Sequence, residues 1–153
     1  MARATMSATR MVAPVANPSS TRIGAVTAGS PALPDIVTGP PPEFDGPGGI
    51  WSPETLLCAA VADCFIHTFR SVSRAAKYSW LNLECRVEGT LERVDAQAQF
   101  TRYACFAKLT VSTDSDLAKA PSLLERAEQS CLISNSLRGI RVLETEVLEE
   151  SRE

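Results

Sequence analysis

The sequence predicts an α+β fold, in which helices are segregated from antiparallel strands. Between residues 81 and 111, apolar and polar residues alternate in two runs, a pattern typical of half-buried strands. Before and after this pair, apolar residues recur every three or four positions, as in helices that bury one face. We expect one domain spanning residues 1–153, a usual length for a single domain. The sequence leaves open whether residues 1–12 are ordered.

The composition excludes several classes of protein. Hydrophobic residues make up 44% and charged residues 22%, which are ordinary globular values and not those of a disordered chain. The net charge is −3, so there is no basic field to hold a nucleic acid. The longest strongly apolar stretch, Leu56–Ala62, is far shorter than the roughly 20 residues of a membrane span. No apolar core of a secretory signal follows Arg3 and Arg10, so we expect a cytoplasmic protein without a membrane or nucleic-acid partner.

The first third of the chain is rich in turn residues. Residues 11–53 hold most of the prolines and glycines, which favour short strands and turns, with possible strands at Arg22–Thr27 and Ile36–Thr38. Ser52, Pro53 and Glu54 then form a helix start, with an N-cap, a proline at the first position and an acid in the first turn. The helix should run to about residue 77, and its wide apolar face should be covered on more than one side.

The rest of the chain predicts a hairpin, a helix and a strand. Two alternating runs, Leu81–Leu91 and Tyr103–Val111, are joined by a short loop near residues 95–98 and should pair as an antiparallel hairpin. A second helix is expected over about Asp116–Cys131, with a regular part that starts late or kinks at Pro121. The last strand should cover Val142–Leu148.

The cysteines favour a reduced compartment. Five cysteines are an odd set, none is in CxxC spacing and His67 is the one histidine, so neither a disulfide framework nor a structural zinc site is expected. Cys85 and Cys105 fall on the inward faces of their strands, where a buried thiol behaves as a small hydrophobe. Cys58 is about 240° around the helix from Cys64, so it too is expected to be structural.

Cys64 and Cys131 differ in their surroundings. Cys64 lies about three turns into its helix, too deep for the helix N-terminus to stabilise a thiolate, and the acid Asp63 precedes it. A reactive Cys64 therefore needs a positive charge from elsewhere in the fold. Cys131 is near the carboxyl end of its helix, so it should stay protonated until it attacks an oxidised partner. His67, one turn after Cys64, could pair with that thiol or be a packed or half-exposed histidine.

Two segments resemble one family. Residues 41–69 read PPEFDGPGGIWSPETLLCAAVADCFIHTF, and residues 127–137 read AEQSCLISNSL. With the order of elements from about residue 22 to residue 147, they resemble the OsmC/Ohr family of osmotically induced and organic-hydroperoxide-resistance proteins. The resemblance implies an intertwined homodimer, with two long central helices and antiparallel sheets around them. It also implies a thiol-dependent peroxidase acting on organic hydroperoxides and, less well, on hydrogen peroxide.

The resemblance assigns a role to four residues. Cys64 falls on the family's peroxidatic cysteine and Cys131 on its resolving cysteine. Glu54 falls on the acid at the helix start, and Arg22 on the arginine 32 residues before it. Arg22 would favour the Cys64 thiolate and donate to a peroxide oxygen, and Glu54 would hold the guanidinium. Cys64 would become a sulfenic acid and then a disulfide with Cys131, which an external dithiol reduces.

Neither a metal nor an organic cofactor is implied. Trp51 and Phe65 are expected to line the substrate pocket or the dimer contact, and residues 134–136 to form a turn that ends a helix. Two positions depart from the family pattern: Asp63 replaces a small residue and Leu132 a proline. These departures keep an alternative open, a non-enzymatic relative that binds a hydrophobic ligand or senses oxidation through one thiol.

Overall fold

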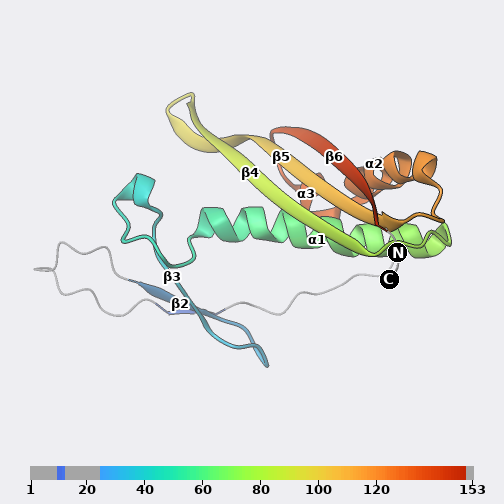
Figure 1. Ribbon diagram of the computed structural model, residues 1–153. Helices are drawn as coiled ribbons and strands as arrows, with labels where there is room; N and C mark the ends of the chain where they lie inside the picture. Colours follow the sequence, from blue (N-terminus) through green and yellow to red (C-terminus); the bar gives the residue numbers. More distant parts are fainter. Residues whose placement is uncertain (1–9, 13–24, 151–153) are drawn as a thin grey trace, which may run out of the picture. The chain divides into compact units, whose positions relative to one another are not determined.

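The computed structural model describes residues 10–12 and 25–150 (Figure 1). The chain forms two compact units, residues 1–56 and 57–153. The long helix α1, Pro53–Ala75, begins in the first unit and continues into the second. Whether the two units act as the one expected domain stays a prediction.

The first unit holds a small antiparallel sheet. Strands β1 (Arg10–Val12), β2 (Val26–Gly29) and β3 (Ile36–Thr38) pair in that order. The prediction of a strand at residues 36–38 is confirmed. The predicted strand at residues 22–27 overlaps β2 only at its end, and residues 22–24 lie outside the described residues.

A glycine-rich loop connects this sheet to α1. After the short 3₁₀ helix η1 (Pro42–Phe44), a Cβ at Gly46 would lie 1.7 Å from the Pro40 carbonyl oxygen, so only glycine fits there. The Gly39 amide donates to the Trp51 carbonyl at 2.8 Å, and Thr38 and Trp51 form a parallel bridge. The loop is thereby closed immediately before the helix begins.

Helix α1 begins as the sequence predicts. The Thr55 amide donates to Ser52 Oγ at 3.1 Å, and the Ser52 amide donates to Thr55 Oγ1 at 2.9 Å. This reciprocal cap satisfies two backbone donors, and Pro53 occupies the first helical position, where a missing N–H costs nothing.

In the second unit, α1 buries one stripe. Val61, Phe65, Phe69 and Ser73 recur every fourth residue and are buried. By length and composition alone α1 could cross a membrane, since an 18-residue window of it has a mean hydropathy of 1.3. In the structure, 22% of that window is buried. The short apolar stretch at residues 56–62 therefore does not decide the question. The core helix of a soluble protein can have the same length and hydropathy, so these properties are weak evidence for a membrane span.

A three-stranded sheet packs against this helix. Strands β4 (Asn82–Val94) and β5 (Gln97–Ser112) form the predicted antiparallel hairpin around a two-residue turn, with φ of 50° at Asp95 and 65° at Ala96. Strand β6 (Ile140–Glu150) pairs with β5 in parallel. The expected antiparallel sheet is therefore mixed. A helical crossover brings the chain back to the end at which β5 begins, so β6 runs in the same direction as β5.

That crossover contains more helix than the sequence predicts. The 3₁₀ helix η2 (Leu117–Lys119) precedes α2 (Ala120–Ser130), whose first turn contains Pro121, so the regular part does start late. Cys131 then separates α2 from a further short helix, α3 (Leu132–Ser136). Residues 134–136, predicted to form a turn that ends a helix, are the last turn of α3, which ends at Ser136.

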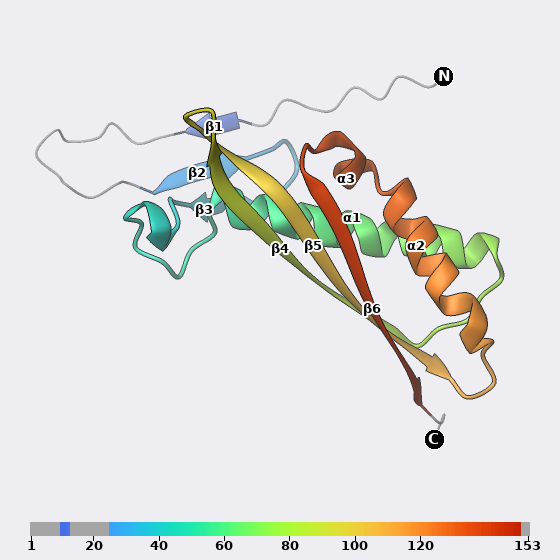
Figure 2. The same cartoon turned by 90° about the horizontal axis from the view of Figure 1, so that it is seen from above.

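The core of the second unit lies between helices and sheet (Figure 2). Alternate residues of β5 face inward and meet the buried stripe of α1 and one face of α2, and Trp80 packs edge-on against Phe69 with ring centroids 5.6 Å apart. Burial of each large apolar side chain stabilises the fold by about 1.5–3 kcal/mol. The α+β fold class is confirmed. The main members of this core are Phe65, Phe69, Leu83, Cys105, Ala107, Leu109, Val111, Leu123, Leu124 and Ala127.

Candidate functional site

Two thiols meet where α1 passes the junction of α2 and α3. Cys64 comes from the third turn of α1, and Cys131 is the residue between the two later helices. A hydrogen bond from the Cys131 thiol is one of the causes that lower the pKa of Cys64. Both thiols are free; Cys64 is half-buried, whereas Cys131 is fully buried. The structure therefore brings together the two cysteines that the sequence singles out.

The environment of Cys64 favours its thiolate. Burial raises the pKa of the Cys64 thiol, but hydrogen bonds from the Ile133 amide, the Cys131 thiol and the Leu132 amide lower it by more. The Thr68 hydroxyl, which donates to the Cys64 carbonyl oxygen at 2.7 Å, acts in the same direction. The net pKa lies below the ordinary value. Two of these donors are the first amides of α3, which have no partner inside their own helix. Backbone amides thus contribute to the stabilisation that the sequence analysis assigned to a distant cation.

The environment of Cys131 favours its neutral thiol. Burial raises the pKa of Cys131, hydrogen bonds from the Ser134 side chain and amide lower it, and the bond to Cys64 and the nearby charge of Cys64 raise it again. The net pKa lies above the ordinary value. The lowered pKa of Cys64 favours its thiolate, and the raised pKa of Cys131 favours its neutral thiol, as the sequence analysis expects for Cys131.

The acid beside Cys64 faces away from it. His67 Nε2 lies 3.4 Å from Asp63 Oδ1, and both side chains are exposed, by 63% and 75%. The imidazole therefore has a carboxylate as its partner, on the solvent side of α1. Asp63 is the first residue of this exposed pair and is not among the groups that shift the pKa of Cys64.

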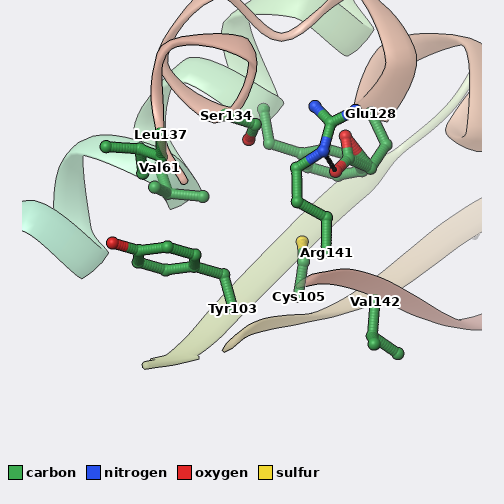
Figure 3. A pocket seen from close by; sticks show the side chains of 9 residues that line it. Val61, Tyr103, Cys105, Glu128, Ser134, Leu137, Arg141 and Val142 are labelled. Carbon is green, nitrogen blue, oxygen red and sulfur yellow. Dashed lines mark ion pairs between the residues drawn. The ribbon is translucent and has the colours of Figure 1, made fainter. Parts of the chain in front are cut away.

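A charged network holds the segment around Cys131, and Figure 3 shows its ion pair between Arg141 and Glu128. Arg141 Nε on β6 lies 3.5 Å from Glu128 Oε1 on α2, and Arg141 Nη1 donates to Asn135 Oδ1 on α3 at 2.6 Å. Asn135 Nδ2 in turn donates to the Gln129 carbonyl at 3.0 Å. These contacts connect β6 to the helices on both sides of Cys131. The sequence analysis missed Glu128 and Arg141, because the two residues are brought together only by the crossover.

The same network borders a small cavity. Its volume of about 10 Å³ is about that of a single water site, and Cys105, Ser134 and Tyr103 are among its lining residues. Glu128 Oε2 is buried and has no hydrogen-bond partner among the residues that the structure describes. Burial raises the pKa of Glu128, and the positive charge of Arg141 opposes this shift.

The other predicted site residues lie elsewhere. Glu54 is in the first unit, where its Oε2 is buried without a hydrogen-bond partner within the described ranges, and Arg22 lies outside those ranges. Trp51 is 50% exposed and lines an open surface pocket with Gly49, Ile50 and Thr55. Phe65 is 1% exposed in the core of the second unit and lines the small cavity. Among residues 10–12 and 25–150, no group of three or more metal-binding side chains is close enough to hold an ion.

Comparison with known proteins assigns the family. The family model described as OsmC-like protein matches residues 46–146. The chain belongs to the OsmC/Ohr family. A curated relative, the uncharacterized protein YmaD of Bacillus subtilis (strain 168), is 28% identical over 102 residues, which cover 65% of this chain and 68% of the relative.

Solved structures share the fold. An OsmC-like protein of unknown function from Vibrio cholerae has a TM-score of 0.81 at 17% identity, over 94% of this chain and 100% of that one. An organic hydroperoxide resistance protein OsmC from Legionella pneumophila has a TM-score of 0.69 at 24% identity, covering 94% and 97% of the two chains. OhrB of Bacillus subtilis has a TM-score of 0.66 at 19% identity, covering 94% and 98%. These likenesses show that the chain has the OsmC-like fold.

Proposed function

We propose that the protein is a thiol-dependent peroxidase that reduces organic hydroperoxides and, less well, hydrogen peroxide. The observation that carries the proposal is the Cys64 sulfur, which accepts hydrogen bonds from the Cys131 thiol and from two backbone amides. These donors favour the thiolate form of Cys64, which is the nucleophilic form of cysteine, and the Cys131 thiol is among them. Family membership, and solved relatives named as organic hydroperoxide resistance proteins, support the same activity.

The proposed cycle starts at Cys64. Its thiolate attacks the distal oxygen of ROOH, the O–O bond breaks, and the alkoxide takes a proton and leaves as the alcohol. The Cys131 sulfur then attacks the resulting sulfenic acid, a disulfide forms, and the oxygen leaves as water. An external dithiol reduces the disulfide and restores both thiols. The Leu132 and Ile133 amides stabilise the attacking thiolate in the first step.

Arg22 and Glu54 complete the proposed site. The buried Glu54 Oε2, which lacks a hydrogen-bond partner in the described part of the chain, is a ready acceptor for a guanidinium. We assign Arg22 to this role, in which its guanidinium would also donate to a peroxide oxygen. Trp51 and Phe65 are proposed to shape the apolar side of the site. Neither a metal nor an organic cofactor takes part in this cycle.

The proposed working form is a cytoplasmic homodimer. Only one stripe of α1 is buried in the second unit, although the helix is long and apolar enough to cross a membrane. A second copy that covers another face of α1 would remove this surface from water, which is the main driving force of association. The proposed partners are therefore a second copy, the hydroperoxide and the dithiol.

A turnover assay tests the proposal. With cumene hydroperoxide and a dithiol, the wild type should show sustained turnover, and Cys64→Ser should fall to the background rate. Cys58→Ser is the matched control, because it removes a half-buried thiol from the same helix and should keep the wild-type rate. Equal background rates for wild type and Cys64→Ser would overturn the proposal.

One observation favours the alternative, a non-enzymatic protein that binds a hydrophobic ligand or senses oxidation. Leu132, which follows the buried thiol, is 71% exposed, although it is a large apolar side chain. In a binding protein, Cys64 would titrate at or above the ordinary thiol value of about 8.5 and would ignore micromolar hydroperoxide. A Cys64 thiol that titrates below this value and is consumed by hydroperoxide would decide for the enzyme.

A further inference from the structure

A second pair of thiols lies inside the sheet. Cys85 Sγ on β4 and Cys105 Sγ on β5 are 3.2 Å apart. In the strand register Cys85 is opposite Ala107 and Val87 is opposite Cys105, so the two thiols are diagonal neighbours. Both belong to or pack against the core, and both are free. Their sulfurs are in contact, but the distance is longer than the ~2.05 Å of an S–S bond, so a disulfide requires the two strands to adjust.

This second pair lies close to the first. Cys105 lines the small cavity together with Ser134, and the Ser134 side chain is hydrogen-bonded to the Cys131 thiol. Figure 3 shows the Cys105 sulfur directed from its strand toward the side of the cavity formed by Glu128. The pKa of Cys105 is raised chiefly by its bond to Cys85 and by burial, and the nearby charge of Cys131 contributes least. Cys105 thus contacts Cys85 and borders the same cavity as the segment that holds Cys131.

We propose that Cys85 and Cys105 are a second redox-active dithiol, which reduces the Cys64–Cys131 disulfide by thiol–disulfide exchange through Cys131. The inference rests on the proposed function, because the peroxidase cycle supplies the disulfide that is reduced. It adds an internal acceptor of oxidising equivalents, so that one chain can reduce a second hydroperoxide before an external dithiol acts.

The exchange takes place in two balanced steps. The Cys105 sulfur attacks the Cys131 sulfur, so that a Cys105–Cys131 bond forms and the Cys64–Cys131 bond breaks. The departing electron pair stays on the Cys64 sulfur, and one thiol proton is lost at Cys105 and gained at Cys64. The Cys85 sulfur then attacks Cys105, releases Cys131 as a thiol and forms the Cys85–Cys105 disulfide. Cys64 and Cys131 are reduced, and Cys85 and Cys105 are oxidised.

The surroundings of the four thiols set the order of these steps. Cys64 has the lowered pKa of the first pair, so it is the better leaving group in the first step. The hydrogen bond from the Cys105 thiol lowers the pKa of Cys85, and burial opposes this shift, so Cys85 is the more readily ionised member of its pair. The same bond and burial raise the pKa of Cys105, which makes its attack on Cys131 the slow step.

Titration without an external reductant tests the inference. Fully reduced protein, freed of reductant, is mixed with excess cumene hydroperoxide, and the equivalents consumed per chain are counted. We expect two for the wild type and one for Cys85→Ser, a twofold difference, while Cys58→Ser should still consume two. Disulfide mapping of the oxidised wild type by mass spectrometry should find both Cys64–Cys131 and Cys85–Cys105, and it needs no variant that must fold.

The outcomes separate this inference from the proposed function. One equivalent per wild-type chain, with only the Cys64–Cys131 disulfide, would overturn the internal dithiol and leave the peroxidase standing. No consumption at all would overturn both. Formation of Cys85–Cys105 at the wild-type rate in Cys131→Ser would overturn the exchange route, because hydroperoxide would then oxidise the sheet thiols directly.

Discussion

The two thiol pairs of the second unit differ in what surrounds them. Cys64 and Cys131 lie among helices, where the first amides of α3 donate to the Cys64 sulfur. Cys85 and Cys105 lie across two strands, and the hydrogen bond between the thiols is the main cause of the shifts in both pKa values. In each pair one thiol has a lowered pKa and the other a raised one.

Contact between two sulfurs, as in Cys85 and Cys105, is not by itself enough to make a nucleophilic thiol. No backbone amide is among the causes that shift the pKa values of Cys85 and Cys105. The amides of β4 and β5 are used by the hydrogen bonds between the two strands. The helix pair has free amides, because the first N–H groups of any helix lack internal partners. We therefore place the reaction with hydroperoxide at Cys64 and give the sheet pair a role only in exchange.

The largest effect that sharpens this comparison is expected from Cys131→Ser. Without the second thiol, Cys64 should react once and stop as a sulfenic acid, because no disulfide can form. Dimedone labelling followed by mass spectrometry should find the adduct on Cys64 in the variant and little in the wild type. Sustained wild-type turnover of the variant, or an adduct on another cysteine, would contradict the assignment of Cys131.

The pH dependence of alkylation should separate the thiols next. A lowered pKa means that the Cys64 thiolate appears at lower pH, so its reaction with iodoacetamide should reach half its maximum at a lower pH than that of Cys58. Cys58 is the internal control, because burial raises its pKa and the Gly89 amide only partly offsets this. Quantifying both sites by mass spectrometry across pH checks the order, and a Cys64 midpoint at or above that of Cys58 would break the comparison.

A smaller effect is expected from Arg141→Met. The change removes the partner of Glu128 and the bond to Asn135, leaving a buried carboxylate at a cost of about 1–3 kcal/mol of unfolding free energy. If α3 is held less firmly, its Leu132 and Ile133 amides should stabilise the Cys64 thiolate less, so the pH midpoint of Cys64 alkylation should rise. Urea denaturation measures the first effect, and alkylation measures the second. Arg138→Met, at an exposed arginine of the preceding loop, is the control and should change neither.

The pH dependence of that loss has a definite sign. The folded-state pKa of Glu128 is raised, so its contribution to stability is fully present below the unfolded pKa and is lost as the pH rises through the folded value. The destabilisation by Arg141→Met should therefore be largest near neutral pH and shrink in acid. Adding Glu128→Gln, which removes the unpaired charge, should restore part of the stability at neutral pH. A loss independent of pH would contradict this account of Glu128.

Much of the fold could be predicted from the sequence. The capping pattern at residues 52–55 located the start of α1, and period-two alternation located the hairpin of β4 and β5. These signals are local, so one sequence is enough to find them. The strand β6 was also found, but its parallel pairing was not, because the direction of a strand depends on the crossover and not on its own residues.

The site could be predicted only in part. The family resemblance singled out Cys64 and Cys131, and the structure brings them together. The amide donors were missed, because residues 132–136 are too few to show a helical period, and only residues 134–136 were interpreted, as a turn that ends a helix. The contacts between Cys85 and Cys105 and between Glu128 and Arg141 were also missed, since each depends on strand register or on the crossover.

The parallel strand β6 has a consequence for self-association. It is an outer strand of its three-stranded sheet in the described part of the chain, and an outer strand offers unpaired backbone groups to any neighbour. From its middle to its end it is densely acidic, with Glu144, Glu146, Glu149 and Glu150. Two such borders approaching each other would place like charges opposite one another, which destabilises strand pairing. Fibre-like stacking through this border is therefore disfavoured, and contact between copies is directed to other surfaces of the molecule.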